Sequence, residues 1–275
     1  MNRTRLAIHG AGGRMGRRLV ALGAADARLE VVAALECPGY LHNGQDAGVL
    51  AGIGEIGVAI GPTLDVDVDC VIDFSVAEAV DGVLELCRGK RLPLVLATTG
   101  LSETKQSLVA SVAKSVPVVW APNMSLAVNL TMELATKAAS VLKDCAGGAD
   151  VEIIERHHRF KRDAPSGTAL RFAELIAGVM GQTEHAHGRE GLVGERPRHE
   201  IGFHAVRTGD NPGEHTILFG LLGESVELTV RVTNRDCYAL GALEAARFAV
   251  RQRPGLYGMD DVLGLGNSAA RDMTP

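Results

Sequence analysis

Hydrophobic and polar positions follow two different periods along the first 120 residues. Short apolar runs, typical of buried strands, alternate with segments whose apolar residues recur at helical spacing. Strands are expected at Arg5–His9, Leu29–Leu35, Cys70–Asp73, Leu94–Ala97 and Val118–Trp120, and helices at Arg14–Leu22, Ala77–Arg88 and Ser102–Lys114. Strands that alternate with helices build parallel βαβ units. The pattern predicts an α/β fold with a Rossmann-like, doubly wound parallel sheet, and an irregular, glycine-rich insertion at 40–68.

The pattern changes after Pro122. A long amphipathic segment precedes a strand, a helix and a polar loop, and three more strand-like runs follow before a last helix. These elements are expected at Leu126–Leu142, Val151–Arg156, Thr168–Met180, 182–200, Ile201–Arg207, His215–Gly220, Val226–Val232 and Ala239–Gln252. The short, turn-linked strands indicate an antiparallel meander. The chain is therefore expected to form a dinucleotide-binding domain, residues 1–124 with 238–275, and a second α+β domain, residues 125–237.

Composition narrows the class of protein. A formal net charge of -5 and 4% aromatic residues disfavour a nucleic-acid binder. The five cysteines are odd in number and lack a Cys-x-x-Cys pair, which favours reduced thiols over disulfides or zinc. No apolar stretch approaches the roughly 20 residues that span a bilayer. We expect a cytoplasmic protein with no membrane partner.

A glycine-rich turn, Gly10-Ala11-Gly12-Gly13-Arg14-Met15-Gly16, stands between the first expected strand and helix. Glycines there let the backbone approach a pyrophosphate, which rests on the helix N-terminus. Glu36, at the end of the second strand, is placed to accept from the adenosine ribose hydroxyls. A strict G-x-G-x-x-G would need glycine at Met15, so the turn could also serve only strand–helix geometry.

Two further segments follow expected strands at the edge where such sheets bind ligands. Their candidate cofactor contacts are Ala97, Thr98 and Thr99 in one, and Ala121, Pro122, Asn123 and Met124 in the other. Cys37-Pro38 follows Glu36, so no arginine stands there to take a 2′-phosphate, although Arg14, Arg17 and Arg18 could reach it. NADH is therefore favoured as the cofactor, and NADPH is possible.

A cationic run leads into the helix expected at Thr168–Met180. Six side chains able to carry positive charge fall within positions 156 to 162, followed by Pro165-Ser166-Gly167-Thr168. Cations beside a helix start form a receptor for a small anion such as a carboxylate. Two imidazoles and an amine add proton-transfer capacity near neutral pH. The competing interpretation of the run is a solvated basic loop. No spacing of His, Cys, Asp or Glu residues around it indicates a metal site. His185 and His187, further along the chain, are expected to be plain loop residues.

Six segments carry a family resemblance: Glu152–Leu170, Gly10–Gly16, Asp73-Phe74-Ser75, Thr98-Thr99-Gly100, Asn123-Met124-Ser125 and Gly213-Glu214-His215-Thr216. With these segments the chain resembles the 4-hydroxy-tetrahydrodipicolinate reductase (dihydrodipicolinate reductase) family. The resemblance covers the whole chain. It implies reduction of a cyclic dicarboxylate by NADH or NADPH in lysine and diaminopimelate biosynthesis, by a homotetramer joined through the second domain. It implies that His157 donates and accepts a proton, that Lys161 donates one, and that His158, Ser166, Gly167 and Thr168 bind substrate.

Five positions depart from the family pattern. Ala97 stands where glycine is common, and Cys37 where an arginine often follows the acid. Val230 stands where the family has histidine, and Thr233 and Asn234 where it has serines. Two other functions stay open on the residues alone. One is a different Rossmann amino-acid dehydrogenase, and the other is a non-catalytic dinucleotide sensor that would need neither His157 nor Lys161.

Overall fold

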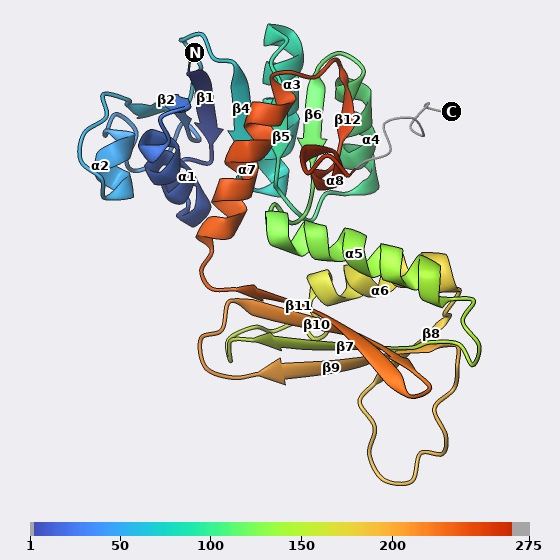
Figure 1. The fold of residues 1–275 in the computed structure, drawn as a ribbon. Coiled ribbons are helices and arrows are strands. Elements are labelled where there is room, and N and C mark those ends of the chain that lie inside the picture. Colours follow the sequence, from blue (N-terminus) through green and yellow to red (C-terminus); the bar gives the residue numbers. More distant parts are fainter. Residues whose placement is uncertain (1–2, 266–275) are drawn as a thin grey trace. The chain divides into compact units, whose positions relative to one another are not determined.

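Residues 3–265 are described by a computed structural model, in which the chain divides into two compact units (Figure 1). One unit comprises residues 1–126 and 236–275, and the other comprises residues 127–235. The chain thus leaves the first unit after the start of α5 (Leu126–Leu142) and returns to it at α7 (Asp236–Ala249). Within residues 3–265, none of the helices combines the length and apolarity that a membrane crossing requires.

The first unit is built on a seven-stranded sheet with the order β12-β6-β5-β4-β1-β2-β3, and every strand pair in it is parallel. Its strands are β1 (Thr4–His9), β2 (Leu29–Leu35), β3 (Ile60–Gly61), β4 (Cys70–Asp73), β5 (Leu94–Leu96), β6 (Pro117–Trp120) and β12 (Gly255–Tyr257). Its helices are α1 (Arg14–Ala25), α2 (Ala47–Ala51), α3 (Val80–Lys90), α4 (Glu103–Ala113), α7 (Asp236–Ala249) and α8 (Met259–Val262), with a 3-10 turn at Ala77–Ala79. The doubly wound parallel sheet is confirmed, and the strand order reverses between β1 and β4.

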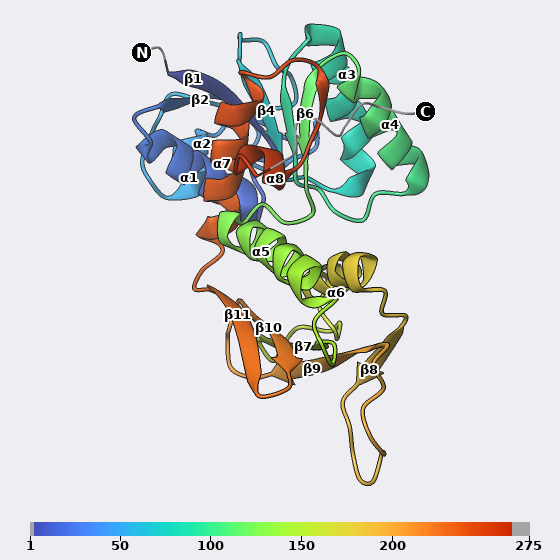
Figure 2. The ribbon, with the colours of Figure 1, turned by 45° about the vertical axis from the view of Figure 1, so that its right-hand side comes forward.

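Hydrophobic cores cover both faces of this sheet, as a parallel sheet requires. Neighbouring side chains of β1 point to opposite faces: Leu6 and Ile8 join the core under α1 and α7, and Ala7 joins the core under α3 and α4. The two helix layers are seen on either side of the sheet in Figure 2. The segment 40–68, expected to be irregular, contains α2 and β3, because Asp46 caps α2 and Ile60 is buried beside β2.

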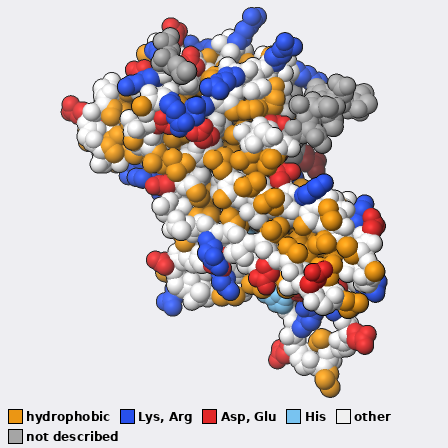
Figure 3. All heavy atoms as spheres, in the orientation of Figure 1, with side chains coloured by type: hydrophobic (Ala, Val, Ile, Leu, Met, Phe, Trp, Pro, Cys, Tyr) orange, Lys and Arg blue, Asp and Glu red, His pale blue; other side chains and the backbone are white. Residues whose placement is uncertain are grey.

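The second unit is a five-stranded sheet with two helices on one face (Figures 1 and 2). Its elements are α5 (Leu126–Leu142), β7 (Asp150–His157), α6 (Gly167–Met180), β8 (Glu184–His187), β9 (Glu200–Arg207), β10 (Gly213–Leu221) and β11 (Glu224–Val232). The strand order is β11-β10-β7-β9-β8. Hydrophobic side chains also lie on the exposed side of α5, where Leu134 and Val141 reach solvent (Figure 3).

The antiparallel meander expected in this unit is wrong in part. β10 pairs antiparallel with β11 and β7, but β9 runs parallel to both β7 and β8. The turn signal at Gly209–Gly213 does connect β9 to β10, yet the two strands flank β7 instead of pairing with each other. Turn residues indicate that the chain changes direction. They do not indicate which strand of the sheet the next strand will pair with.

The expected loop at 182–200 is also partly wrong, because it contains the edge strand β8. His185 and His187, expected to be plain loop residues, lie on this strand and pack against Phe203 of β9. Their ring centroids lie 5.0 Å and 5.5 Å from that of Phe203. Strand β8 has the sequence Glu-His-Ala-His, so it has no apolar run from which a strand could be predicted.

Candidate active site

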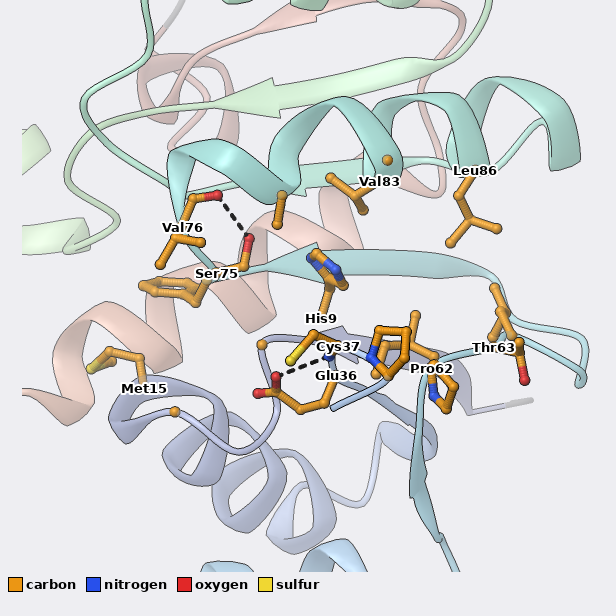
Figure 4. A pocket seen from close by; sticks show the side chains of 18 of the residues that line it. His9, Met15, Glu36, Cys37, Pro62, Thr63, Ser75, Val76, Val83 and Leu86 are labelled. Carbon is orange, nitrogen blue, oxygen red and sulfur yellow. Dashed lines mark hydrogen bonds between the residues drawn. The ribbon is translucent and has the colours of Figure 1, made fainter. Parts of the chain in front are cut away.

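A cavity of about 1050 Å³ lies in the first unit at the carboxyl ends of β1, β2 and β4 (Figure 4). Its wall includes five of the predicted cofactor contacts: Gly10, Gly13, Arg14, Met15 and Glu36. The wall is completed by His9, Leu35, Cys37-Pro38, the segment 62–65, Phe74-Ser75-Val76, Ala79 and the face of α3. This is the crevice at the reversal of strand order in which open α/β sheets bind their ligands.

Backbone geometry explains two glycines of the turn. Gly10 has φ +78°, and a Cβ there would lie 2.9 Å from the carbonyl oxygen of Phe74. A Cβ at Gly16 would overlap the carbonyl oxygen of Gly10 as the helix packs on the turn. Gly13 is the N-cap of α1 and supplies no side-chain hydrogen bond. The N–H groups of the first turn of α1 are therefore available to an anion such as a pyrophosphate.

Glu36 is oriented by the glycine turn. Its Oε1 accepts a hydrogen bond from the Gly12 N–H at 2.8 Å, and its Oε2 accepts from the Cys37 N–H at 3.3 Å. Of the three arginines considered for a 2′-phosphate, Arg17 donates to the Gly12 carbonyl and Arg18 pairs with Asp236. Only Arg14 of these lines the cavity. Lys90 of α3 lines it as well, a cation that the sequence pattern did not single out.

The other predicted cofactor contacts lie beside this cavity and do not line it. Ala11 and Gly12 belong to the glycine turn, and the Gly12 N–H donates a hydrogen bond to Glu36. Ala97, Thr98 and Thr99 follow β5, while Ala121, Pro122, Asn123 and Met124 follow β6. Both segments follow the carboxyl ends of their strands; β5 adjoins β4, and β6 adjoins β5. Most of their side chains are buried. The Thr98 hydroxyl donates to Asp73 at 2.5 Å.

The cationic run of the second unit is anchored by a buried pair. Glu155 and His157 lie two positions apart on β7, so both point toward the helix-covered face. Glu155 is fully buried, and its Oε2 lies 2.5 Å from Nδ1 of His157. Arg207 of β9 donates to both carboxylate oxygens of Glu155, at 2.7 Å and 2.8 Å. The Ser166 N–H adds a fourth hydrogen bond, at 3.1 Å.

These contacts set the charge states of the pair. Burial alone would raise the pKa of Glu155, but the hydrogen bonds from Arg207 and His157 hold it below the ordinary value. Burial lowers the pKa of His157, and although Glu155 opposes this effect, the nearby positive charges of Lys161 and Arg207 add to it. The result is an ionised glutamate behind a histidine that is poised to give up its proton.

The start of α6 adjoins this pair. Ser166 is the N-cap, and its Oγ accepts from the Ala169 N–H at 3.2 Å and lies 3.0 Å from Nε2 of His215. The Ser166 side chain, predicted to bind substrate, is thus buried and engaged with the protein itself. Gly167 and Thr168 form the first turn of α6, where N–H groups point toward the helix end.

Lys161 and His158 complete the cluster. The Lys161 ammonium lies 2.8 Å from both carboxylate oxygens of Asp163. Nδ1 of His158 is buried and has no hydrogen-bond partner among residues 3–265. The Lys161 N–H donates to the His158 carbonyl at 3.1 Å, which holds the two residues in one turn.

The sequence reasoning gave no role to four residues of this site: Glu155, Arg207, Gly213 and His215. All but Arg207 lie in the motifs that carry the family resemblance. The Glu155-x-His157 spacing on a strand was a usable signal, because it places both side chains on one face. Gly213 has φ +154°, and a Cβ there would lie 3.0 Å from Nε2 of His157. His215 pairs across the sheet with Glu155, and its ring centroid lies 5.2 Å from that of His157.

No group of three or more His, Cys, Asp or Glu side chains within residues 3–265 is arranged to hold a metal ion. The parallel sheet with its glycine turn and crevice, together with a second unit that carries acid–base groups beside a helix start, defines a Rossmann-fold oxidoreductase that uses a dinucleotide.

The comparisons with known proteins identify the family. Residues 4–124 match the family model "Dihydrodipicolinate reductase, N-terminus" and residues 127–263 match "Dihydrodipicolinate reductase, C-terminus". The chain belongs to the dihydrodipicolinate reductase family, as its motifs predicted.

Curated relatives extend over nearly the whole chain. The 4-hydroxy-tetrahydrodipicolinate reductase of Rhodopirellula baltica is 56% identical over 271 residues, which cover 96% of this chain and 97% of that protein. The reductase of Alkalilimnicola ehrlichii is 48% identical, over 95% of this chain and 99% of that protein. The solved structure "Dipicolinate bound Dihydrodipicolinate reductase from Paenisporosarcina sp. TG-14" is similar with a TM-score of 0.77 and 26% identity, over 94% of this chain and 99% of that one.

Proposed function

We propose that this protein catalyses the NAD(P)H-dependent reduction of 4-hydroxy-tetrahydrodipicolinate to tetrahydrodipicolinate, a step of lysine and diaminopimelate biosynthesis. The observation that carries the proposal is the Glu155–His157 pair beside Lys161 and the start of α6, in a chain of this family. A non-catalytic sensor has no need of a histidine held at 2.5 Å by a buried carboxylate.

The substrate is a dicarboxylate, and the second unit offers donors for it. The N–H groups of Gly167 and Thr168 in the first turn of α6 suit one carboxylate, where the helix dipole favours negative charge. The unpartnered Nδ1 of His158 and the Lys161 ammonium add donors close by in the chain. The relative from Paenisporosarcina was crystallised with dipicolinate, which is itself a dicarboxylate. This supports a dicarboxylate site here.

The acid–base groups account for the proton that the reaction needs. Loss of the 4-hydroxyl as water gives a conjugated imine, to which a bound dinucleotide would supply a hydride; the electron-rich, enamine-like species that results must gain a proton. In this proposal Lys161 donates the proton and His157 exchanges one, which the pKa of His157, lowered by burial, supports. Glu155 holds the imidazole through Nδ1, so Nε2 is the nitrogen left for substrate. The surrounding cations also stabilise the charge that develops on the substrate.

The first unit fits a dinucleotide, with a preference for NADH. The open N–H groups of α1 suit the pyrophosphate, and Glu36 stands where the adenosine ribose would lie. Glu36 repels a 2′-phosphate, and its neighbour Cys37 lines the cavity without charge. Among residues 3–265, Arg14 and Lys90 are the two Lys or Arg side chains on the cavity wall, and both favour NADPH. We weigh the position next to Glu36 more heavily and expect NADH to be preferred.

The protein is further proposed to be a cytoplasmic homotetramer that assembles through the second unit. The sheet of this unit carries α5 and α6 on one face, and its other face is not covered by a helix of residues 127–235 (Figure 1). Its other face presents Val206, which is exposed, together with the ion pairs of Glu152 with Arg189 and Arg196. Light scattering of the purified protein should give four times the mass of one 28.9 kDa chain. A monomer or dimer would refute the proposed assembly.

A coupled assay with freshly prepared substrate tests the activity. NADH absorbance should fall only when the dicarboxylate is present, and the His157→Gln protein should bind NADH with little turnover. Binding of NADH without oxidation in the wild type would favour a sensor. Turnover with an amino acid or its keto acid in place of the cyclic substrate would favour another dehydrogenase.

A further inference from the structure

A buried carboxylate at the end of β4 holds two side chains from neighbouring strand ends. Asp73 is fully buried, and its Oδ1 lies 2.5 Å from Nδ1 of His9 at the end of β1. Its Oδ2 accepts a hydrogen bond from the Thr98 hydroxyl, just after β5, at 2.5 Å. The Asp73 carboxylate lies in the first unit, apart from the acid–base groups of the second unit. Its two donors satisfy both oxygens, so the group has a defined orientation.

The contact with Asp73 determines which ring nitrogen of His9 carries the proton. An ionised carboxylate only accepts, so the Nδ1 of His9 carries the proton that it donates to Asp73. In the neutral ring, Nε2 is then an acceptor, and it has no partner among residues 3–265. His9 lines the cavity of the first unit, and its side chain is 19% exposed (Figure 4). The free ring edge therefore belongs to the cavity wall.

The other walls identify the part of the cofactor that this edge would meet. The glycine turn takes the pyrophosphate and Glu36 the adenosine ribose in this type of fold. The space beyond them, between residues 62–65 and α3, is the place for the adenosine half of the dinucleotide. Adenosine offers hydrogen-bond donors to an acceptor in the exocyclic amino group of adenine and in the ribose hydroxyls.

We propose that His9 is a cofactor-binding residue that accepts a hydrogen bond from the adenosine half of the dinucleotide through Nε2, and that Asp73 positions it. The inference rests on the proposed function only in requiring a dinucleotide in this cavity. The same carboxylate holds Thr98 on the segment after β5, so Asp73 joins the adenosine side of the site to that neighbouring segment.

Two substitutions of His9 separate its two nitrogens. In His9→Asn, the amide nitrogen occupies the place of Nδ1 and keeps the contact with Asp73, but nothing replaces Nε2. In His9→Gln, the longer amide reaches the place of Nε2. The probes are NADH and ADP-ribose, which share the adenosine half, with affinities measured by calorimetry in the absence of substrate. His199→Asn, an exposed histidine of the second unit, is the control.

His9→Asn should weaken both NADH and ADP-ribose about fivefold, the scale of one neutral hydrogen bond, and by the same factor for each. His9→Gln should stay within about twofold of wild type, as should the control. Asp73→Asn should weaken ADP-ribose to a similar extent and add little to His9→Asn, because the two residues act as one unit.

Wild-type affinity for ADP-ribose in His9→Asn would overturn the inference, as would a loss confined to NADH, which would place His9 at the nicotinamide half. Equal losses in the Asn and Gln variants would also overturn it, because a merely structural histidine is not rescued by the Nε2 mimic. If the wild-type protein binds neither probe, the proposed function fails together with the inference.

Discussion

Oε2 of Glu155 lies 2.5 Å from Nδ1 of His157, two positions further along β7. The Glu155 carboxylate is fully buried and also accepts hydrogen bonds from both terminal nitrogens of Arg207. This arrangement fixes the imidazole through one nitrogen and leaves the other to substrate.

Lys161 and His157 should both be needed for turnover. Replacing Lys161 by Ala should lower kcat by about a hundredfold or more, the scale of general acid catalysis, while NADH affinity stays near wild type because Lys161 belongs to the second unit. His157→Gln should behave alike, and the double variant should fall well short of additive. Arg162→Ala, an exposed cation of the same run, is the matched control for charge. Near-normal turnover of Lys161→Ala would refute its role.

Glu155→Gln should lower kcat by about tenfold or more and shift the pH profile. Glu155 raises the pKa of His157 against the effect of burial, so removing its charge lowers that pKa further. The limb of the kcat profile that reports the protonated imidazole should move to lower pH. Glu152→Gln, on the opposite face of the same strand, should leave the profile in place. An unshifted profile in Glu155→Gln would contradict the pairing.

Gly213→Ala should impair catalysis through His157. The new Cβ would lie 3.0 Å from Nε2 of His157 at a φ of +154°, so the imidazole must move. We expect kcat to fall about tenfold or more with unchanged NADH affinity, because misplacing a reacting group carries a large cost in rate. Gly220→Ala on the same strand is the control, since its Cβ would meet nothing closer than 3.9 Å. Equal activities of the two variants would contradict this account.

His215 should make the protein less stable in acid. Burial, aided by the positive charge on His157, lowers the pKa of His215 from 6.5 to about 4. The unfolded chain then binds the proton more tightly, so this contribution to stability is present above pH 6.5 and is lost as the pH falls through about 4. The loss from this group is about 3 kcal/mol. Urea unfolding of wild type and His215→Gln, at one protein concentration, should show a smaller pH dependence in the variant.

A pH dependence of the free energy of unfolding that is the same in both proteins would show that His215 does not titrate in this way. His199→Gln is the control, because its exposed side chain should not alter that dependence.

Cofactor preference should respond to position 37. The wild type should favour NADH by about tenfold in kcat/KM, or about 1.4 kcal/mol, and Cys37→Arg should shift the ratio toward NADPH. Arg14→Ala should lower NADPH use more than NADH use, because a guanidinium on the cavity wall can pair with the 2′-phosphate. A wild-type preference for NADPH would show that Arg14 and Lys90 outweigh Glu36.

The sequence determined the features that depend on neighbours in the chain. Alternating apolar strands and helices produced the parallel sheet, and the glycine turn at the end of β1 fixed the place of the cavity. The cap at Ser166 and the cationic run were visible because capping and charge clustering act within a few residues. These local patterns were enough to assign the fold class and the family.

The tertiary structure alone decided what lies behind the cationic run. Arg207 is 52 residues from Glu155, and its strand pairs parallel with β7, where turn signals favoured an antiparallel meander. The same holds for His9 and Asp73, which meet across 64 residues because β1 and β4 are neighbours in the sheet. Strand alternation reports which face a side chain takes, but the partner it meets there depends on which strands pair and in which register. Strand pairing and register depend on how complete faces of the sheet and helices are buried against each other, and no local sequence pattern encodes this.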